Sequence, residues 1–151
     1  MPETNVHGTA IVIGTRGLIF VGPSGSGKST LAFACLAAAR RMGLFSALVA
    51  DDQVMISVRG GQVLARPPAT IAGLIELRGS GIVAVETLAP AILHHAVLPV
   101  DLSEAERLPA EAEDLELTPE AILPLIRLSA TAPDPLAMLG AFIPFNGKAP
   151  S

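Results

Sequence analysis

The chain has 151 residues, which suits one domain, and half of them are hydrophobic, enough for a sizeable core. The formal net charge of −4 argues against a protein that tracks a nucleic-acid backbone, since such proteins cluster Lys and Arg. Gly, Pro or charge interrupts every apolar run before it could span a bilayer, no signal peptide is evident, and the single Cys35 suits a reducing compartment. We therefore predict a cytoplasmic protein without a membrane or nucleic-acid partner.

The first third of the chain predicts a β-hairpin followed by a helix. Residues 6–14 alternate like a strand, TRG suggests a turn, and LIFVG at 18–22 is typical of a second, buried strand. Residues 28–42 are rich in Ala and Leu and end in basic residues, as a helix prefers, and Gly43 follows as a stop.

The middle third predicts further strands. SALVADD at 46–52 is a short apolar strand that ends in two acids, and residues 53–68 predict a hairpin that turns at Gly60–Gly61. Residues 68–86 predict a short helical or irregular piece, a Gly-rich turn and a strand. Residues 93–102 predict one more strand.

The last third is less regular. Residues 103–117 are acidic and polar, which favours a solvated surface segment over an acidic binding tail. Pro and apolar residues then mix, and the pattern predicts a short helix at about Pro135 to Phe142. We expect residues 146–151 to be frayed, and residues 1–151 to form one α/β domain.

The most informative motif is GPSGSGKST, which matches the phosphate-loop pattern G-x-x-x-x-G-K-[ST] between a predicted strand and a predicted helix. Glycines let backbone N–H groups turn inward, and the helix N-terminus favours an anion. Lys28 offers a mobile charge for the outer phosphates, and Ser29 offers a hydroxyl to Mg²⁺. The motif favours nucleotide binding over a merely structural turn. The predicted nucleotide-binding residues are Gly22, Pro23, Ser24, Gly25, Ser26, Gly27, Lys28, Ser29 and Thr30.

A phosphate-loop enzyme also needs an acid near the metal, and Asp51 and Asp52 end an apolar strand. This resembles a Walker B strand, but it comes only 22 residues after Ser29. Adjacent strand residues point to opposite sides, so one carboxylate can face metal and phosphate while the other faces elsewhere. Taken alone, a pair of acids that begins a turn is an equally good interpretation.

Histidines and a Glu-x-Arg pair supply further candidates. His7 opens the first strand, where a lone histidine is more often structural than functional; the neighbouring His94 and His95 are interpreted as structural. Glu76 and Arg78 share a face in an extended chain. Near a phosphate, Glu76 could bind a metal ion and Arg78 could stabilise the negative charge of the transition state. A surface ion pair ahead of a turn is an equally good interpretation.

Four pieces occur in order: VHG at 6–8, GPSGSGKS at 22–29, VADD at 49–52 and ELRGSGI at 76–82. Together they resemble the HPr kinase/phosphorylase family, bacterial enzymes that phosphorylate a serine of the carrier protein HPr. The resemblance covers about residues 5 to 100. It implies an α/β phosphate-loop kinase core related to phosphoenolpyruvate carboxykinase, with β-hairpins flanking the phosphate-loop helix, and a homo-oligomer that is usually a hexamer.

The resemblance also implies roles for single residues. Lys28 and the loop would bind ATP, and Ser29 and Glu76 would hold Mg²⁺, with Asp51 as a further metal candidate. Asp52 would accept the proton of the substrate serine and would donate it in the reverse reaction, in which phosphate attacks phosphoserine and pyrophosphate forms.

Two further residues complete the catalytic set that the resemblance implies. His7 would lie in the active site next to the phosphates, and Arg78 would belong to a signature loop used in both directions. Together with Lys28 and Asp52, they are the predicted catalytic residues.

The chain departs from the family pattern in three places. It begins almost at the strand of His7, like a catalytic core alone, and Thr30 replaces an acid. The family's late Gly-Arg-Asn loop has no counterpart after Val100, where only Arg107 and Arg127 occur. The resemblance therefore supports the kinase reaction more strongly than the phosphorylase reaction. Two alternatives stay open: a small-molecule kinase, although no Arg-rich lid is evident, and a non-catalytic nucleotide-binding regulatory module.

Overall fold

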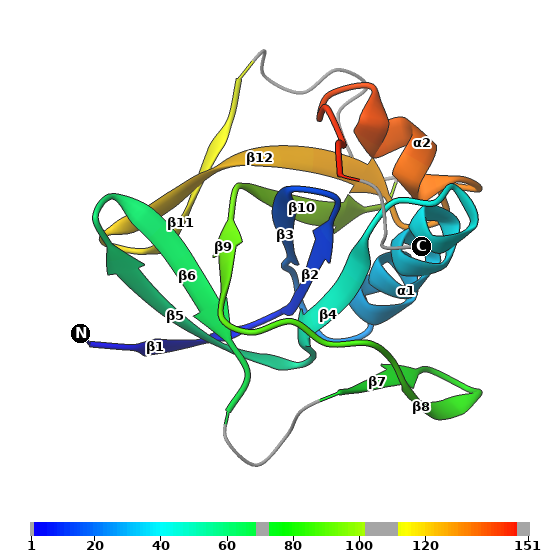
Figure 1. The fold of residues 1–151 in the computed structure, drawn as a ribbon, viewed down its shortest axis with the longest axis horizontal. Coiled ribbons are helices and arrows are strands. Elements are labelled where there is room, and N and C mark those ends of the chain that lie inside the picture. Colours follow the sequence, from blue (N-terminus) through cyan, green and yellow to red (C-terminus); the bar gives the residue numbers. More distant parts are fainter. Residues whose placement is uncertain (1, 69–72, 102–111, 148–151) are drawn as a thin grey trace.

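The computed structural model describes residues 2–68, 73–101 and 112–147. This part of the chain holds two helices and three β-sheets (Figure 1). In chain order the elements are β1 (Thr4–His7), β2 (Thr9–Ile13), β3 (Arg16–Phe20), α1 (Lys28–Arg41), β4 (Ser46–Ala50), β5 (Gln53–Arg59), β6 (Gln62–Arg66), β7 (Leu74–Leu77), β8 (Gly81–Ala84), β9 (Ala91–Leu93), β10 (His95–Val100), β11 (Asp114–Thr118), β12 (Ala121–Ser129) and α2 (Pro135–Gly140).

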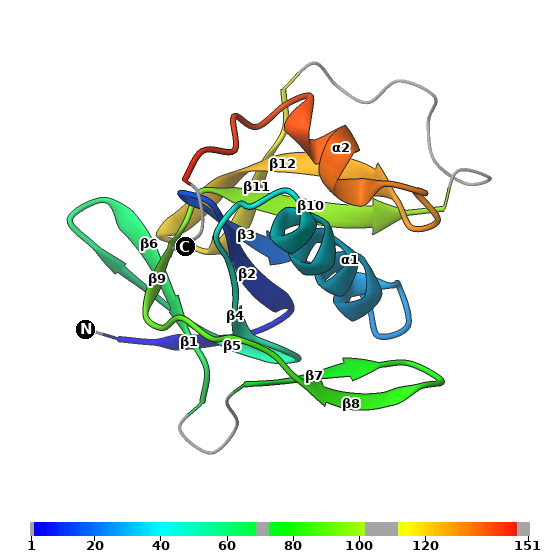
Figure 2. The same ribbon diagram turned by 45° about the vertical axis from the view of Figure 1, so that its right-hand side comes forward.

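A six-stranded mixed sheet, in the order β11-β12-β10-β3-β2-β4, forms the middle layer. Helices α1 and α2 lie against one face of it, and the four-stranded antiparallel sheet β1-β5-β6-β9 lies against the other (Figures 1 and 2). The two-stranded β7–β8 hairpin lies beneath α1 in both views.

The covered faces explain why residues 10–13 of β2 and 17–20 of β3 contain no polar side chain. Ile11 and Phe20 belong to the core on the helix side, whereas Val12 and Ile19 belong to the core against the four-stranded sheet. A strand covered on both sides has no solvent face, so it loses the alternation of a half-exposed strand. Strand β3 leads directly from this double core into the phosphate loop.

Most elements predicted from sequence are confirmed. β2 and β3 form the first hairpin, and β5 and β6 form the second, around glycines at 60 and 61. Helix α1 runs from Lys28 to Arg41 with its basic residues in the last turn, and Gly43 follows with a positive φ of 76°. The short helix near the C-terminus is α2, whose N-terminal N–H of Ala137 bonds the Asp134 side chain.

Three expectations are wrong in detail, and one strand was not predicted. The piece expected to be helical or irregular contains strand β7, which pairs with β8, and residues 93–102 contribute to two strands in different sheets. The described part of the acidic segment holds strand β11, whose Asp114 and Glu116 are exposed as a surface segment would be. Strand β12 was not predicted, because pairing with its neighbours compensates for its weak local pattern. Gly147, expected to be frayed, accepts a hydrogen bond from the N–H of Phe45 at 2.9 Å. Residues 69–72, 102–111 and 148–151, on which parts of the predictions fall, lie outside the described part.

Candidate active site

The phosphate loop connects β3 to α1, and glycine determines its shape. Gly22, Gly25 and Gly27 have φ values of 128°, 81° and 99°, in a region that side chains with a Cβ rarely adopt. Gly27 caps α1, and its carbonyl accepts the N–H of Leu31 at 2.9 Å, which starts the helix ladder. The loop thus places a helix N-terminus at the end of a buried strand, an arrangement suited to phosphate.

Lys28 is held across this loop by two backbone carbonyl groups. Its ammonium donates to the carbonyl oxygens of Gly22 and Pro23 at 2.7 and 2.9 Å, and it lies 3.2 Å from Nε2 of His7. Burial lowers the pKa of Lys28, while the charges of Asp52 and Asp51 act in the opposite direction. The lysine is therefore already at the loop, with acceptors that a phosphate oxygen could replace.

His7 connects Lys28 to Asp52. Because an ammonium only donates, Nε2 of His7 accepts, and the ring proton lies on Nδ1, which is 3.3 Å from an Asp52 carboxylate oxygen. β1 pairs antiparallel with β5, and the N–H of Gly8 donates to the carbonyl of Asp52 at 3.1 Å, which brings these distant residues together. Taken alone, the sequence favoured a structural role for His7, whereas in the structure His7 lines the cavity beside the phosphate loop.

Asp52 has an unusual backbone conformation. Its φ is +71°, and it is the single described residue other than glycine with a positive φ. Such a conformation costs free energy in a residue with a side chain, and the surrounding structure must hold it. Here the 3.1 Å bond from Gly8 fixes the peptide, so the carboxylate faces His7 and the cavity beside the phosphate loop.

Asp51 turns to different partners. One carboxylate oxygen accepts the hydroxyl protons of Ser29 at 2.7 Å and Thr9 at 2.8 Å, and the other accepts the backbone N–H of Glu76 at 3.1 Å. The predicted divergence of the two acids is therefore present, but neither leaves the site, because Asp51 bonds Ser29 and Asp52 bonds His7.

The β7–β8 hairpin closes one side of a cavity of about 160 Å³ over the loop. Glu76 and Arg78 both line it, and a Cβ on Gly25 would lie 2.6 Å from Nη1 of Arg78, so the guanidinium lies against the loop. No ion pair joins Glu76 to Arg78 in the described structure, which removes the interpretation as a surface ion pair. The lining residues are His7, Thr9, Ser24, Gly25, Gly27, Lys28, Ser29, Thr30, Asp52, Glu76 and Arg78.

The predicted Mg²⁺ ligands fit a partial shell. Among the described residues, no three His, Cys, Asp or Glu side chains gather closely enough to hold a metal by themselves. Mg²⁺ usually takes only one or two protein oxygens and completes its shell with phosphate and water. The hydroxyl of Ser29 beside the Asp51 carboxylate, with Glu76 in the same cavity, offers such a set.

The other histidines lie outside this cavity. Nδ1 of His94 accepts the N–H of Gly17 at 2.9 Å, and burial, aided by the charge of Arg16, lowers the pKa of both His94 and His95. The predicted structural role of His94 agrees with this hydrogen bond.

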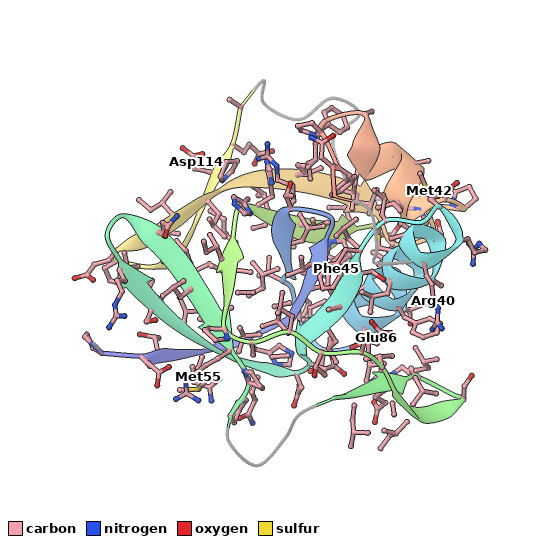
Figure 3. All side chains as sticks on the ribbon, in the orientation of Figure 1. Arg40, Met42, Phe45, Met55, Glu86 and Asp114 are labelled. Carbon is pink, nitrogen blue, oxygen red and sulfur yellow. The ribbon has the colours of Figure 1, made fainter. Side chains whose placement is uncertain are left out.

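A larger cavity, of about 930 Å³, lies between α1 and the segment after β8. Arg40, Phe45 and Glu86 line it (Figure 3). Nothing in the sequence pointed to this cavity.

No described helix is long and apolar enough to cross a membrane.

Residues 1–118 match the model of the HPr Serine kinase C-terminal domain. The chain belongs to this family. It is 38% identical over 87 residues to an HPr kinase/phosphorylase of Clostridium beijerinckii and 36% identical over 87 residues to one of Clostridium tetani. Each match covers 58% of this chain and 27% of the relative, so the chain spans about a quarter of the length of these relatives.

Solved structures add the fold. The structure described as the Hpr(Ser) kinase/phosphatase from Coxiella burnetii superposes with a TM-score of 0.74 at 19% identity, covering 91% of this chain and 92% of that one. The expected α/β phosphate-loop kinase fold of this family is thereby confirmed.

One residue of the site was not predicted. Thr9 lines the small cavity and bonds Asp51, yet it belongs to none of the motifs quoted from the sequence. The available signal was a polar residue that interrupts the buried side of a strand directly after VHG.

Proposed function

We propose that this domain binds ATP with Mg²⁺ and transfers the γ-phosphoryl group to a serine hydroxyl of HPr. One observation carries the proposal: the Asp52 carboxylate and the Lys28 ammonium meet through His7 at the same phosphate-loop cavity. A base for a hydroxyl and a cation for a phosphoryl group are the two parts that such a transfer needs. The family membership and the named relatives support HPr as the acceptor.

Each residue then has a distinct task. The loop backbone and Lys28 bind the phosphates, and Lys28 exchanges its bonds to Gly22 and Pro23 for phosphate oxygens. Ser29, Glu76 and Asp51 are the residues that would hold Mg²⁺, which, when bound, neutralises charge on the phosphate oxygens.

The acceptor side depends on Asp52. Its carboxylate accepts the proton of the serine hydroxyl as that oxygen bonds the γ-phosphorus and the bond to the leaving ADP breaks. His7 keeps Asp52 oriented through Nδ1, and Arg78 offers positive charge from the hairpin side of the cavity. In the reverse direction Asp52 would return the proton to serine. Phosphorylase activity is therefore a companion proposal to the kinase reaction. A cytoplasmic location and a hexameric homo-oligomer stay predictions.

The test is the intact mass of HPr after incubation with the purified domain, ATP and Mg²⁺. A gain of one phosphoryl group, absent with Lys28→Ala, supports the proposal. Phosphorylation of a metabolite instead of HPr would favour a small-molecule kinase. Bound ATP without turnover of either acceptor would favour a nucleotide-binding regulatory module.

A further inference from the structure

Thr9 carries a polar group into the core. Its exposed fraction is 0%, and Thr9 and Lys28 are the two polar or charged residues among the buried residues that the structure describes. A buried hydroxyl destabilises a fold unless it is hydrogen-bonded. The hydroxyl of Thr9 donates to a carboxylate oxygen of Asp51 at 2.8 Å and lies 3.5 Å from the hydroxyl of Ser29.

Asp51 is the meeting point of three elements. It accepts from Thr9 at the start of β2, from Ser29 in the first turn of α1, and from the N–H of Glu76 on β7. Three donors on two oxygens leave the carboxylate little freedom to rotate. The orientation of Asp51 also determines that of Ser29, because the Ser29 proton points to Asp51 and its lone pairs then point away from it.

Of these donors, Thr9 is the least able to move. Ser29 belongs to the first turn of the phosphate-loop helix, and Glu76 belongs to a two-stranded hairpin. Thr9 lies on an inner strand that pairs with β3 and β4, and β-branching restricts its χ1 angle. Its hydroxyl is therefore the fixed reference of the group.

We propose that Thr9 is a positioning residue for the metal side of the site. It holds Asp51 so that Ser29 presents its lone pairs to Mg²⁺ and the hairpin with Glu76 stays attached to the phosphate loop. This inference rests on the proposed binding of ATP with Mg²⁺, but not on HPr as the acceptor.

The experiment measures the affinity of a fluorescent ATP analogue at a series of Mg²⁺ concentrations and in excess chelator. Thr9→Val keeps the shape and removes the donor, and it should weaken the Mg²⁺-dependent part of binding by about tenfold, as expected for a lost hydrogen bond to a carboxylate. Binding in chelator should change by less than about twofold, because the hydroxyl of Thr9 bonds Asp51 and Thr9→Val leaves the lysine and the loop glycines in place. Thr9→Ser restores the hydroxyl and should restore most of the Mg²⁺ effect.

Thr118→Val is the matched control. The hydroxyl of Thr118 accepts the N–H of Ala121 at 3.2 Å at the opposite edge of the six-stranded sheet. This variant also loses a hydroxyl hydrogen bond, and its Mg²⁺ dependence should equal that of the wild type. Thr9→Ala serves as a second probe if Thr9→Val does not fold, because a smaller side chain cannot overfill the core.

The outcomes separate the two proposals. A folded Thr9→Val or Thr9→Ala with wild-type Mg²⁺ dependence overturns the role of Thr9 alone, and so does a Thr9→Ser variant as impaired as Thr9→Val. A wild-type domain that does not bind the analogue with Mg²⁺ overturns the proposed function and this inference with it. Normal Mg²⁺-dependent binding without transfer to HPr overturns the acceptor and leaves the role of Thr9 supported.

Discussion

The phosphate loop and the β7–β8 hairpin line one cavity, but different interactions hold them. The loop is held by nearby residues: positive φ values at its glycines, the N–H of Ser26 on the carbonyl of Pro23 at 3.1 Å, and the bonds from Lys28 to two loop carbonyls. Its shape therefore follows from a contiguous stretch of sequence.

The hairpin depends on residues far along the chain. Ile75 is fully buried in the core with α1, and the N–H of Glu76 bonds the carboxylate of Asp51. A two-stranded hairpin is marginally stable by itself, so these contacts decide where Glu76 and Arg78 lie. One half of the site is therefore organised by adjacent residues and the other half by tertiary packing.

The strongest way to break the local half is Lys28→Ala. It removes the charge that faces the outer phosphates, and we expect ATP-dependent transfer to fall by about a thousandfold. The measurement is the initial rate of HPr phosphorylation, with circular dichroism to show that the variant folds. A folded variant with an unchanged rate would contradict the assignment of the site.

Asp52→Asn tests the acceptor side of the same cavity. The amide cannot take the serine proton, so transfer should fall by about a hundredfold or more while ATP affinity stays nearly intact. Rate and affinity are measured separately. Asp51→Asn is the matched variant. If only Asp51→Asn lowers the transfer rate while ATP affinity is retained, the base is Asp51.

A pair of isoleucines tests the tertiary half. Ile75→Ala empties a site with 0% exposure and should lower the free energy of unfolding by about 2–5 kcal/mol. Ile82 lies on the facing strand of the same hairpin and is 65% exposed. Ile82→Ala should therefore change the free energy of unfolding by less than about 0.5 kcal/mol. Urea denaturation measures both. Equal effects would mean that the hairpin is not held through Ile75.

The smallest expected effect comes from the point where the two halves touch. Gly25→Ala places a Cβ against the Arg78 guanidinium at a φ of +81°, so it should cost about 1–2 kcal/mol and weaken ATP binding. Gly60→Ala imposes similar backbone strain at φ +58° in open space, and it should lower stability without affecting ATP binding. Equal ATP affinities in the two variants would show that Gly25 and Arg78 are not coupled.

Several features could be predicted because their causes are local. The glycines and Lys28 identified the phosphate loop, and Ala- and Leu-rich residues identified α1. Strand β7 was missed because a four-residue strand carries too little periodicity to be distinguished from an irregular segment. The nine-residue β12 was missed because Pro124 weakens its strand pattern. In the structure Pro124 precedes Leu125, the residue at which the parallel pairing with β10 begins, so the proline lies outside that pairing.

The sequence by itself determined the loop, its helix and the two acids at the end of β4, since each follows from the conformational preferences of adjacent residues. Only the tertiary structure decided that Asp52 meets His7 through the pairing of β1 with β5, and that Asp51 joins Thr9, Ser29 and Glu76. These contacts join residues 22 to 45 positions apart. Strand register and buried hydrogen bonds determine them, and neither leaves a periodic signal in a single sequence.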